Sequence, residues 1–124
     1  MSHTAVFALG GHWRCLTDDQ LRALADAGGV MGIAFVPFFI DQEAASLDRL
    51  VDHIAYVAEF VGVDHVAIGS DYDGMGDIAP VPGDISHLPD ITVALMQRGF
   101  NDDEIEKIWG GNFLRVMAAA DAVR

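Results

Sequence analysis

The sequence predicts an α/β fold whose parallel sheet is too small to be complete. Two short and continuous apolar runs, 30–36 and 66–69, alternate with segments of helical periodicity. A continuous apolar run is typical of a strand buried on both faces, as in a parallel sheet, and strands that alternate with helices indicate βα units. Because two strands leave open edges and poorly covered faces, residues 1–124 are expected to form one incomplete domain.

The first half of the chain holds one predicted helix before the first strand. Thr17 and Gln20 have the spacing of a capping box, in which each side chain bonds the other residue's backbone. The helix is expected to run to about Ala27 and to stop at the glycine that follows it. The strand predicted over 30–36 then ends at Pro37.

A long amphipathic helix is predicted between the two strands. Apolar residues recur at helical spacing from about Ser46 to Val61, and Gly62 stops the helix. The second buried strand, 66–69, follows at once. It leads into the longest irregular stretch of the chain, a loop rich in Gly and Pro over 74–89.

Two or three helices are predicted to close the chain. Asn101 and Glu104 repeat the capping-box spacing. The last helix is expected to begin at Asn112, after Gly110 and Gly111.

The charge and cysteine content of the chain limit the partners and the location that can be expected. The net charge is −12, from 19 acidic residues against 7 Lys and Arg, which disfavours binding to nucleic acid or to anionic membranes. The single cysteine excludes an internal disulfide. No charged and apolar leader opens the chain, and no apolar run approaches the roughly 20 residues of a membrane span. A cytoplasmic location is therefore favoured.

Acidic side chains directly follow the second predicted strand. Reactive residues of α/β folds lie where strands end at their carboxyl side, and Asp71 and Asp73 hold that position. A carboxylate there is costly unless it binds a cation or hydrogen-bond donors, although Asp and Gly also form simple turns. A calcium loop is not predicted, because Met75 and Pro82 occupy its fifth and twelfth positions.

Residues near the N-terminus are weaker candidates. His3 would stand at the end of a strand if one preceded it, but a lone histidine is more often structural. Arg14 offers a planar guanidinium that suits a carboxylate, or is an ordinary surface arginine. Cys15 has no local support as a nucleophile. His53, on the long predicted helix, is expected to be structural.

Several stretches, in this order, resemble motifs of the membrane (renal) dipeptidase family, peptidase family M19. They are Ser-His-Thr-Ala (2–5), His-x-Arg-x-Leu-Thr-Asp-Asp (12–19), Gly-Gly-Val-Met-Gly-Ile-x-Phe (28–35), Ile-Gly-Ser-Asp-Tyr-Asp-Gly (68–74) and Gly-Gly-Asn-Phe-Leu-Arg-Val (110–116). No single stretch is specific, but together they cover essentially the whole chain.

The resemblance implies a fold, a reaction and three site residues. Enzymes of this family are (β/α)₈ TIM barrels of the metallo-dependent hydrolase (amidohydrolase-like) type, in which two zinc ions hydrolyse dipeptides. Residues 1–124 would be the C-terminal part of that barrel, with its last strands and its C-terminal helices. His3 matches a zinc ligand, and Arg14 matches the arginine that binds the dipeptide's terminal carboxylate. Asp71 matches an aspartate that transfers a proton or orients the substrate.

The sequence also departs from the family pattern. The His-x-Asp pair, the bridging Glu and the other His ligand would all lie upstream of Ser2, and one His cannot hold a catalytic zinc. Trp13 and Cys15 stand where the family usually has Pro and Asn. The chain is therefore expected to be inactive alone. The alternatives are a non-catalytic remnant that self-associates or pairs through its open sheet edge, or one half of a composite site completed by a separate N-terminal half.

Overall fold

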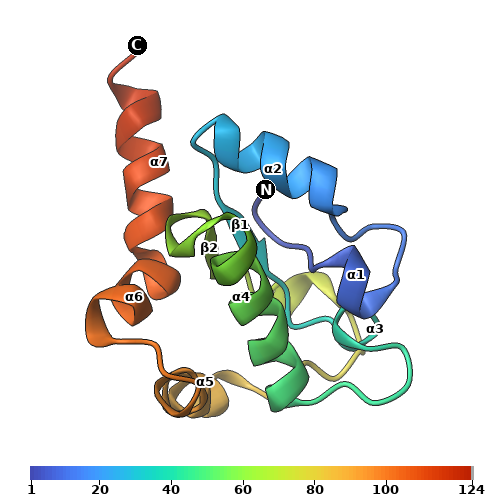
Figure 1. The fold of residues 1–124 in the computed structure, drawn as a ribbon. Helices are drawn as coiled ribbons and strands as arrows, with labels where there is room; N and C mark the ends of the chain where they lie inside the picture. Colours follow the sequence, from blue (N-terminus) through green and yellow to red (C-terminus); the bar gives the residue numbers. More distant parts are fainter. Residues whose placement is uncertain (124) are drawn as a thin grey trace.

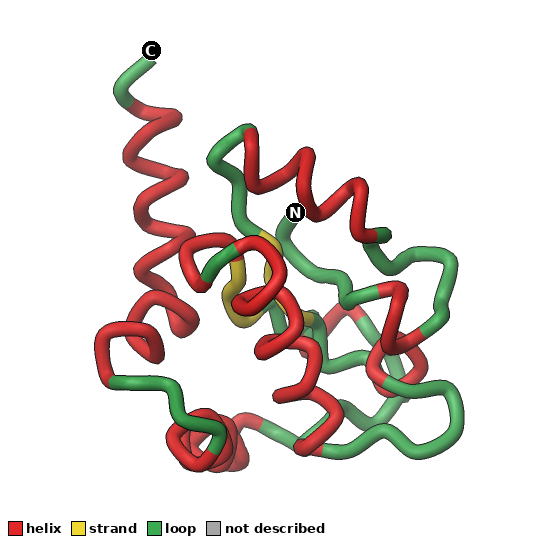
Figure 2. The backbone as a smooth tube through the Cα atoms, viewed as in Figure 1, coloured by secondary structure: helices red, strands yellow, loops and turns green. Residues whose placement is uncertain are grey.

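The computed structural model describes residues 1–123, which place a small sheet among helices (Figures 1 and 2). The elements, in chain order, are α1 (Phe7–Gly10), α2 (Asp18–Asp26), β1 (Met31–Ile33), α3 (Pro37–Ile40), α4 (Leu47–Val61), η1 (Val63–His65), β2 (Val66–Ile68), η2 (Tyr72–Gly74), η3 (Ile85–His87), α5 (Leu88–Gln97), α6 (Asp102–Glu106), the π-helix η4 (Lys107–Gly111) and α7 (Asn112–Asp121). The α/β class predicted from the sequence is confirmed.

The sheet is parallel throughout. β1 pairs with β2 in parallel, with Gly32 opposite Ala67. On the other side of β1, Thr4 forms a parallel bridge with Ile33, and its N–H donates to the carbonyl of Gly32 at 2.9 Å. The order is therefore the N-terminal segment, β1 and β2. Because the three run in the same direction, the chain leaves all of them at the same edge of the sheet.

The predicted strands differ from the observed ones in length. Every residue over 30–36 is buried, as expected for a parallel sheet. Regular strand structure nevertheless covers only Met31–Ile33, so the prediction of a strand to Val36 was too long. Pro37 does more than end the strand, because it occupies the first turn of α3, where its fixed φ suits a helix start. The second strand, predicted over 66–69, forms as β2.

The helix boundaries predicted from caps are confirmed. Thr17 with Gln20 and Asn101 with Glu104 both form complete capping boxes, at the starts of α2 and α6. Ser46 caps α4 by accepting the N–H of Arg49. The apolar stripe of α4 packs into the one hydrophobic core that the described residues form.

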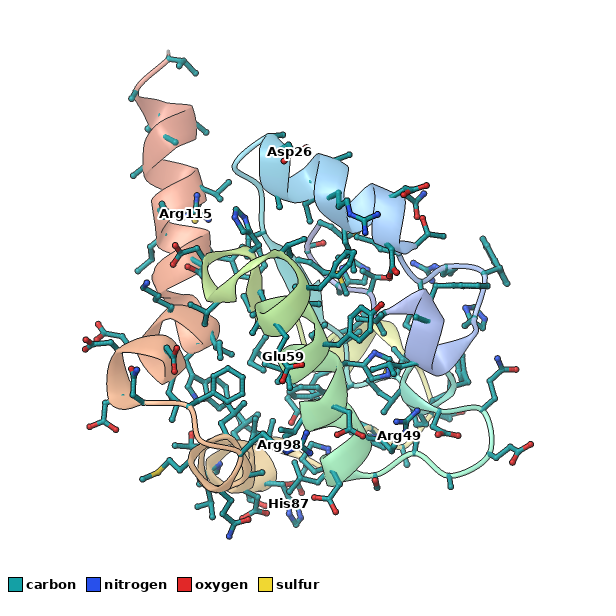
Figure 3. All side chains as sticks on the ribbon, in the orientation of Figure 1. Asp26, Arg49, Glu59, His87, Arg98 and Arg115 are labelled. Atoms are coloured by element: carbon teal, nitrogen blue, oxygen red, sulfur yellow. The ribbon has the colours of Figure 1, made fainter. Side chains whose placement is uncertain are left out.

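The last helix, α7, begins at Asn112, as predicted from the sequence. The chain passes from α6 through the π-helix η4 into α7, and Gly111 has helical angles, φ −54° and ψ −40°. Tertiary contacts override the weak helix propensity of glycine here. Arg115 on α7, labelled in Figure 3, donates from one guanidinium nitrogen to the carbonyl of Gly28 at 2.8 Å and from another to that of Asp64 at 2.7 Å. α7 is thereby fixed to the end of α2 and to η1.

Candidate active site

The candidate residues are carried by segments that flank the small sheet: His3 precedes Thr4, which bridges β1 and bonds the Arg14 carbonyl, and Asp71 follows β2. The carbonyl of Ser2 packs so closely against Gly32 and Gly69 that a Cβ at either glycine would overlap it. The residue before His3 therefore lies across both strands and reaches the loop that carries Asp71. Neither glycine has a positive φ, so the close approach of backbone, and not a special turn, requires glycine at both positions.

His3 is held on one ring nitrogen. Its Nδ1 lies 2.8 Å from the hydroxyl oxygen of Ser2, and its side chain is half-buried. Within the described residues, its Nε2 makes no hydrogen bond. With the proton on Nδ1 and shared with Ser2, the lone pair of Nε2 is available to a metal ion.

Arg14 has an anchored backbone and an exposed charge. Its carbonyl accepts a 2.8 Å hydrogen bond from the buried hydroxyl of Thr4, the residue after His3. Its guanidinium carbon lies 5.3 Å from the centre of the Phe39 ring, on α3. In the part of the chain that the structure describes, Arg14 forms no ion pair. This arrangement suits the binding of an anion, because the backbone of Arg14 is fixed while its guanidinium stays exposed.

The two departures in the Arg14 loop are accommodated on opposite sides. Cys15 points inward, where its thiol contacts the carbonyl of Phe39 at 3.7 Å. Burial raises the pKa of the Cys15 thiol, which favours the unreactive protonated form. Trp13 is 82% exposed, and the ring of His12 lies 5.6 Å from its ring and 4.8 Å from that of Phe39.

Asp71 adopts a left-handed backbone conformation, with φ 70° and ψ 27°. Among the described residues, it is the one non-glycine residue with positive φ. The carbonyl of Ser70 fixes the start of this turn by accepting the N–H of Phe35 at 2.8 Å. A Cβ at Gly74 would overlap Oδ1 of Asp71, so glycine makes room for the carboxylate. Asp tolerates this conformation better than most residues, and such conformations gather at functional sites.

Tyr72 was missed by the sequence reasoning. Its ring packs edge-on against Phe35 at 5.3 Å, and its buried hydroxyl has no hydrogen-bond partner among the residues described. Burial raises the pKa of Tyr72, and the charge of Asp84 adds to the effect. Its position beside Asp71 was the available signal, but an aromatic residue after a strand has no specific meaning on its own.

The candidate residues do not make a complete metal site by themselves. Over residues 1–123, His3, Arg14 and Asp71 share no hydrogen bond or ion pair, and no three His, Cys, Asp or Glu side chains gather where a metal could bind. The two-zinc site implied by the resemblance therefore does not fit this chain alone.

A pocket of about 320 Å³ lies elsewhere, between α4 and the turn from α5 to α6. Figure 3 labels Glu59 and Arg98, which line it from α4 and from the end of α5. None of the candidate residues contributes to its walls.

The family of membrane dipeptidases, peptidase family M19, matches residues 1–124. The chain belongs to this family. Dipeptidase ataJ from Aspergillus terreus is 39% identical, over 98% of this chain and 30% of its own length. Dipeptidase aclJ from Aspergillus oryzae is 38% identical over the same shares. The chain thus spans less than a third of these curated relatives.

Solved structures of the membrane dipeptidase family show where the fold belongs. The probable dipeptidase PvdM from Pseudomonas aeruginosa superposes with a TM-score of 0.80 at 26% identity, covering 91% of this chain and 42% of that one. A metallopeptidase from Rhodobacter sphaeroides, bound to a phosphinate mimic of L-Ala-D-Ala, gives 0.80 at 27%, covering 90% and 33%. The predicted fold is confirmed as a partial α/β portion of the TIM barrel of these metallopeptidases. Among residues 1–123, every helix falls short of the length and apolar character that a membrane span requires.

Proposed function

We propose that residues 1–124 supply one wall of the active site of a zinc dipeptidase and that they are inactive alone. The proposal is supported by the family match over the whole chain together with the segments that carry the candidates. His3 precedes Thr4, which bridges β1 and bonds the Arg14 carbonyl, and Asp71 follows β2 at the edge where the parallel strands end. That edge, where parallel strands end, carries the active site in barrel enzymes.

Each candidate residue has its own role in this proposal. Arg14 binds the terminal carboxylate of a dipeptide, because a planar guanidinium accepts a carboxylate in two parallel hydrogen bonds. Asp71 moves a proton at the scissile amide, as a carboxylate within hydrogen-bond reach of the leaving nitrogen can do. His3 supplies one ligand to one of two zinc ions, whose other ligands come from protein outside this chain.

A chimera tests the proposal. Residues 1–124 replace the matching segment of dipeptidase aclJ from Aspergillus oryzae, which is 38% identical to them. The purified chimera is expected to hydrolyse dipeptides when supplied with zinc, and His3→Ala is expected to abolish the activity. The isolated chain is expected to be inactive under the same conditions. Turnover by the isolated chain, or a folded chimera that binds zinc without hydrolysing dipeptides, would contradict the proposal.

The second candidate is a non-catalytic chain that pairs with another copy of itself. It is favoured by α7, which extends away from the body of the molecule in Figure 1 and exposes Leu114 (66%) and Met117 (61%) on one face.

On this second hypothesis, the chain is expected to elute from a sizing column as a dimer or larger species. Leu114→Glu should shift it toward the monomer, because a charge on the apolar face opposes pairing. Ala119→Glu places the same charge at an exposed position on the opposite side of α7 and should not have this effect. A monomeric wild-type chain across the accessible concentration range would rule out self-association.

A further inference from the structure

The side chain of His53, on α4, is fully buried and bonded at both ring nitrogens. Its Nδ1 accepts the N–H of Val6 at 3.0 Å, and its Nε2 lies 2.8 Å from the carbonyl of Ile40. A backbone N–H can only donate, so Nδ1 must be unprotonated. A carbonyl can only accept, so Nε2 must carry the proton. One neutral tautomer therefore satisfies both partners.

The first partner of His53 belongs to the segment that holds the backbone of Arg14. Val6 forms a parallel bridge with Leu16, and the N–H of Phe7 donates to the carbonyl of Leu16 at 2.9 Å. Two residues earlier in the same segment, the Thr4 hydroxyl donates to the carbonyl of Arg14. The Val6 bond thus fixes the strand-like segment to which the Arg14 loop is attached.

The second partner belongs to the helix that supports the Arg14 side chain. Ile40 ends α3. The ring of the preceding residue, Phe39, lies under the guanidinium of Arg14, and the Phe39 carbonyl accepts a hydrogen bond from the thiol of Cys15. Gly10 of α1 packs on the carbonyl of Phe39 so closely that a Cβ would overlap it. α1, α3 and the Arg14 loop therefore meet around one imidazole.

We infer that His53 is the positioning residue of Arg14, because its two hydrogen bonds join the segment under the Arg14 backbone to the helix under the Arg14 guanidinium. The functional consequence rests on the proposed role of Arg14 in binding a carboxylate, whereas the positioning itself depends only on the contacts described. An apolar side chain of similar size would fill the same space but leave a buried N–H and a buried carbonyl unpaired.

Burial, first, and then the neighbouring hydrogen bond and charges set the response of His53 to pH. Burial lowers the pKa of His53 from its ordinary 6.5, and the charge of Arg49 lowers it further. The bond to Ile40 and the charges of Asp52 and Asp41 oppose this shift. No residue of α1 or α3 is titratable. Because the pKa of His53 is lower in the folded chain, neutral His53 makes its full contribution to the free energy of unfolding above pH 6.5. That contribution is lost as the pH falls from 6.5 through the folded pKa.

Nuclear magnetic resonance of the 124-residue chain tests the inference without any substrate. In the wild type at pH 7.5, the ¹⁵N shifts of His53 should report a proton on Nε2 alone. On lowering the pH, the amide of Val6 and the Nε–H signal of Arg14 should shift together with the titration of His53. A proton on Nδ1 of His53 would overturn the inference, and so would an Arg14 Nε–H signal that does not shift as His53 titrates.

Variants give a second readout. His53→Leu should accelerate hydrogen exchange at Val6 and Leu16 by about tenfold or more, the effect of losing a buried hydrogen bond. His53→Asn keeps an acceptor near Val6 and should retain part of that protection. His65→Leu is the matched control, because it removes a 2.8 Å bond between a histidine and the carbonyl of Gly29.

Equal hydrogen-exchange rates at Val6 and Leu16 in His53→Leu and His65→Leu would overturn the inference. If His53→Leu does not fold, the titration of the wild-type chain decides whether His53 positions Arg14. None of these readouts involves a dipeptide. An Arg14 that fails to bind carboxylates would therefore refute the proposed function and leave the positioning role standing, and an active chimera would not rescue a refuted positioning role.

Discussion

Replacing Asn112 by Ala is expected to lower the free energy of unfolding by about 2–4 kcal/mol. Asn112 is 2% exposed, and its Nδ2 donates to the carbonyls of Val63 at 2.7 Å and Val66 at 2.8 Å. One amide therefore ties the start of α7 to η1 and to the start of β2. Alanine would leave two carbonyls without their donor in an environment that water does not freely reach. Urea denaturation followed by circular dichroism measures the change.

Two further variants separate this effect from a general loss of packing. Asn112→Asp keeps the shape of the side chain but sets carboxylate oxygen against two carbonyls, so it should cost more than Ala at pH 7. At pH 4 the difference should narrow, because a protonated carboxyl can donate one bond. Asn101→Ala removes an exposed cap of α6 and should cost about 1 kcal/mol. If Asn112→Ala costs no more than Asn101→Ala, the tie between α7 and β2 is not important for stability.

The sequence predicted the local features of the fold well, because caps and apolar periodicity depend on near neighbours. The capping box of Thr17 and Gln20 follows from residues three positions apart, and the apolar stripe of α4 follows from a single helix. The role of Asn112 could not be predicted in the same way. Its acceptors lie 46 and 49 residues away, and no local pattern specifies them.

The candidate site was predictable in position more than in detail. Asp71 stands out because it follows a buried strand, and the structure adds its left-handed backbone and the glycine that makes room for it. Arg14 could not be distinguished from a surface arginine by composition, since its anchors, Thr4 and Phe39, become neighbours only on folding. The positioning role of His53 likewise depends on two partners from different elements. The roles assigned to the site residues came from the family resemblance and stay predictions.

Exchanging Asp71 for Asn in the chimera with dipeptidase aclJ is expected to lower kcat by about 10²–10⁴-fold, the usual contribution of a positioned general acid or base. Asn keeps the size of the side chain and also tolerates the left-handed conformation of Asp71, so the fold should be retained. The amide cannot take up and release a proton at neutral pH. Steady-state kinetics on one dipeptide, with circular dichroism of each variant, measures the effect.

The division of the loss between kcat and KM identifies the role. Asp71→Asn should act mainly on kcat, whereas Arg14→Ala should act mainly on KM, because a carboxylate contact made equally in the ground and transition states changes binding alone. Asp73→Asn is the matched control, since this exposed carboxylate lies two residues further on and should leave both constants within about twofold. If Asp73→Asn lowers kcat as much as Asp71→Asn does, the loss reflects the negative charge of the loop and not proton transfer by Asp71. If Asp71→Asn changes KM alone, this aspartate orients the substrate and transfers no proton.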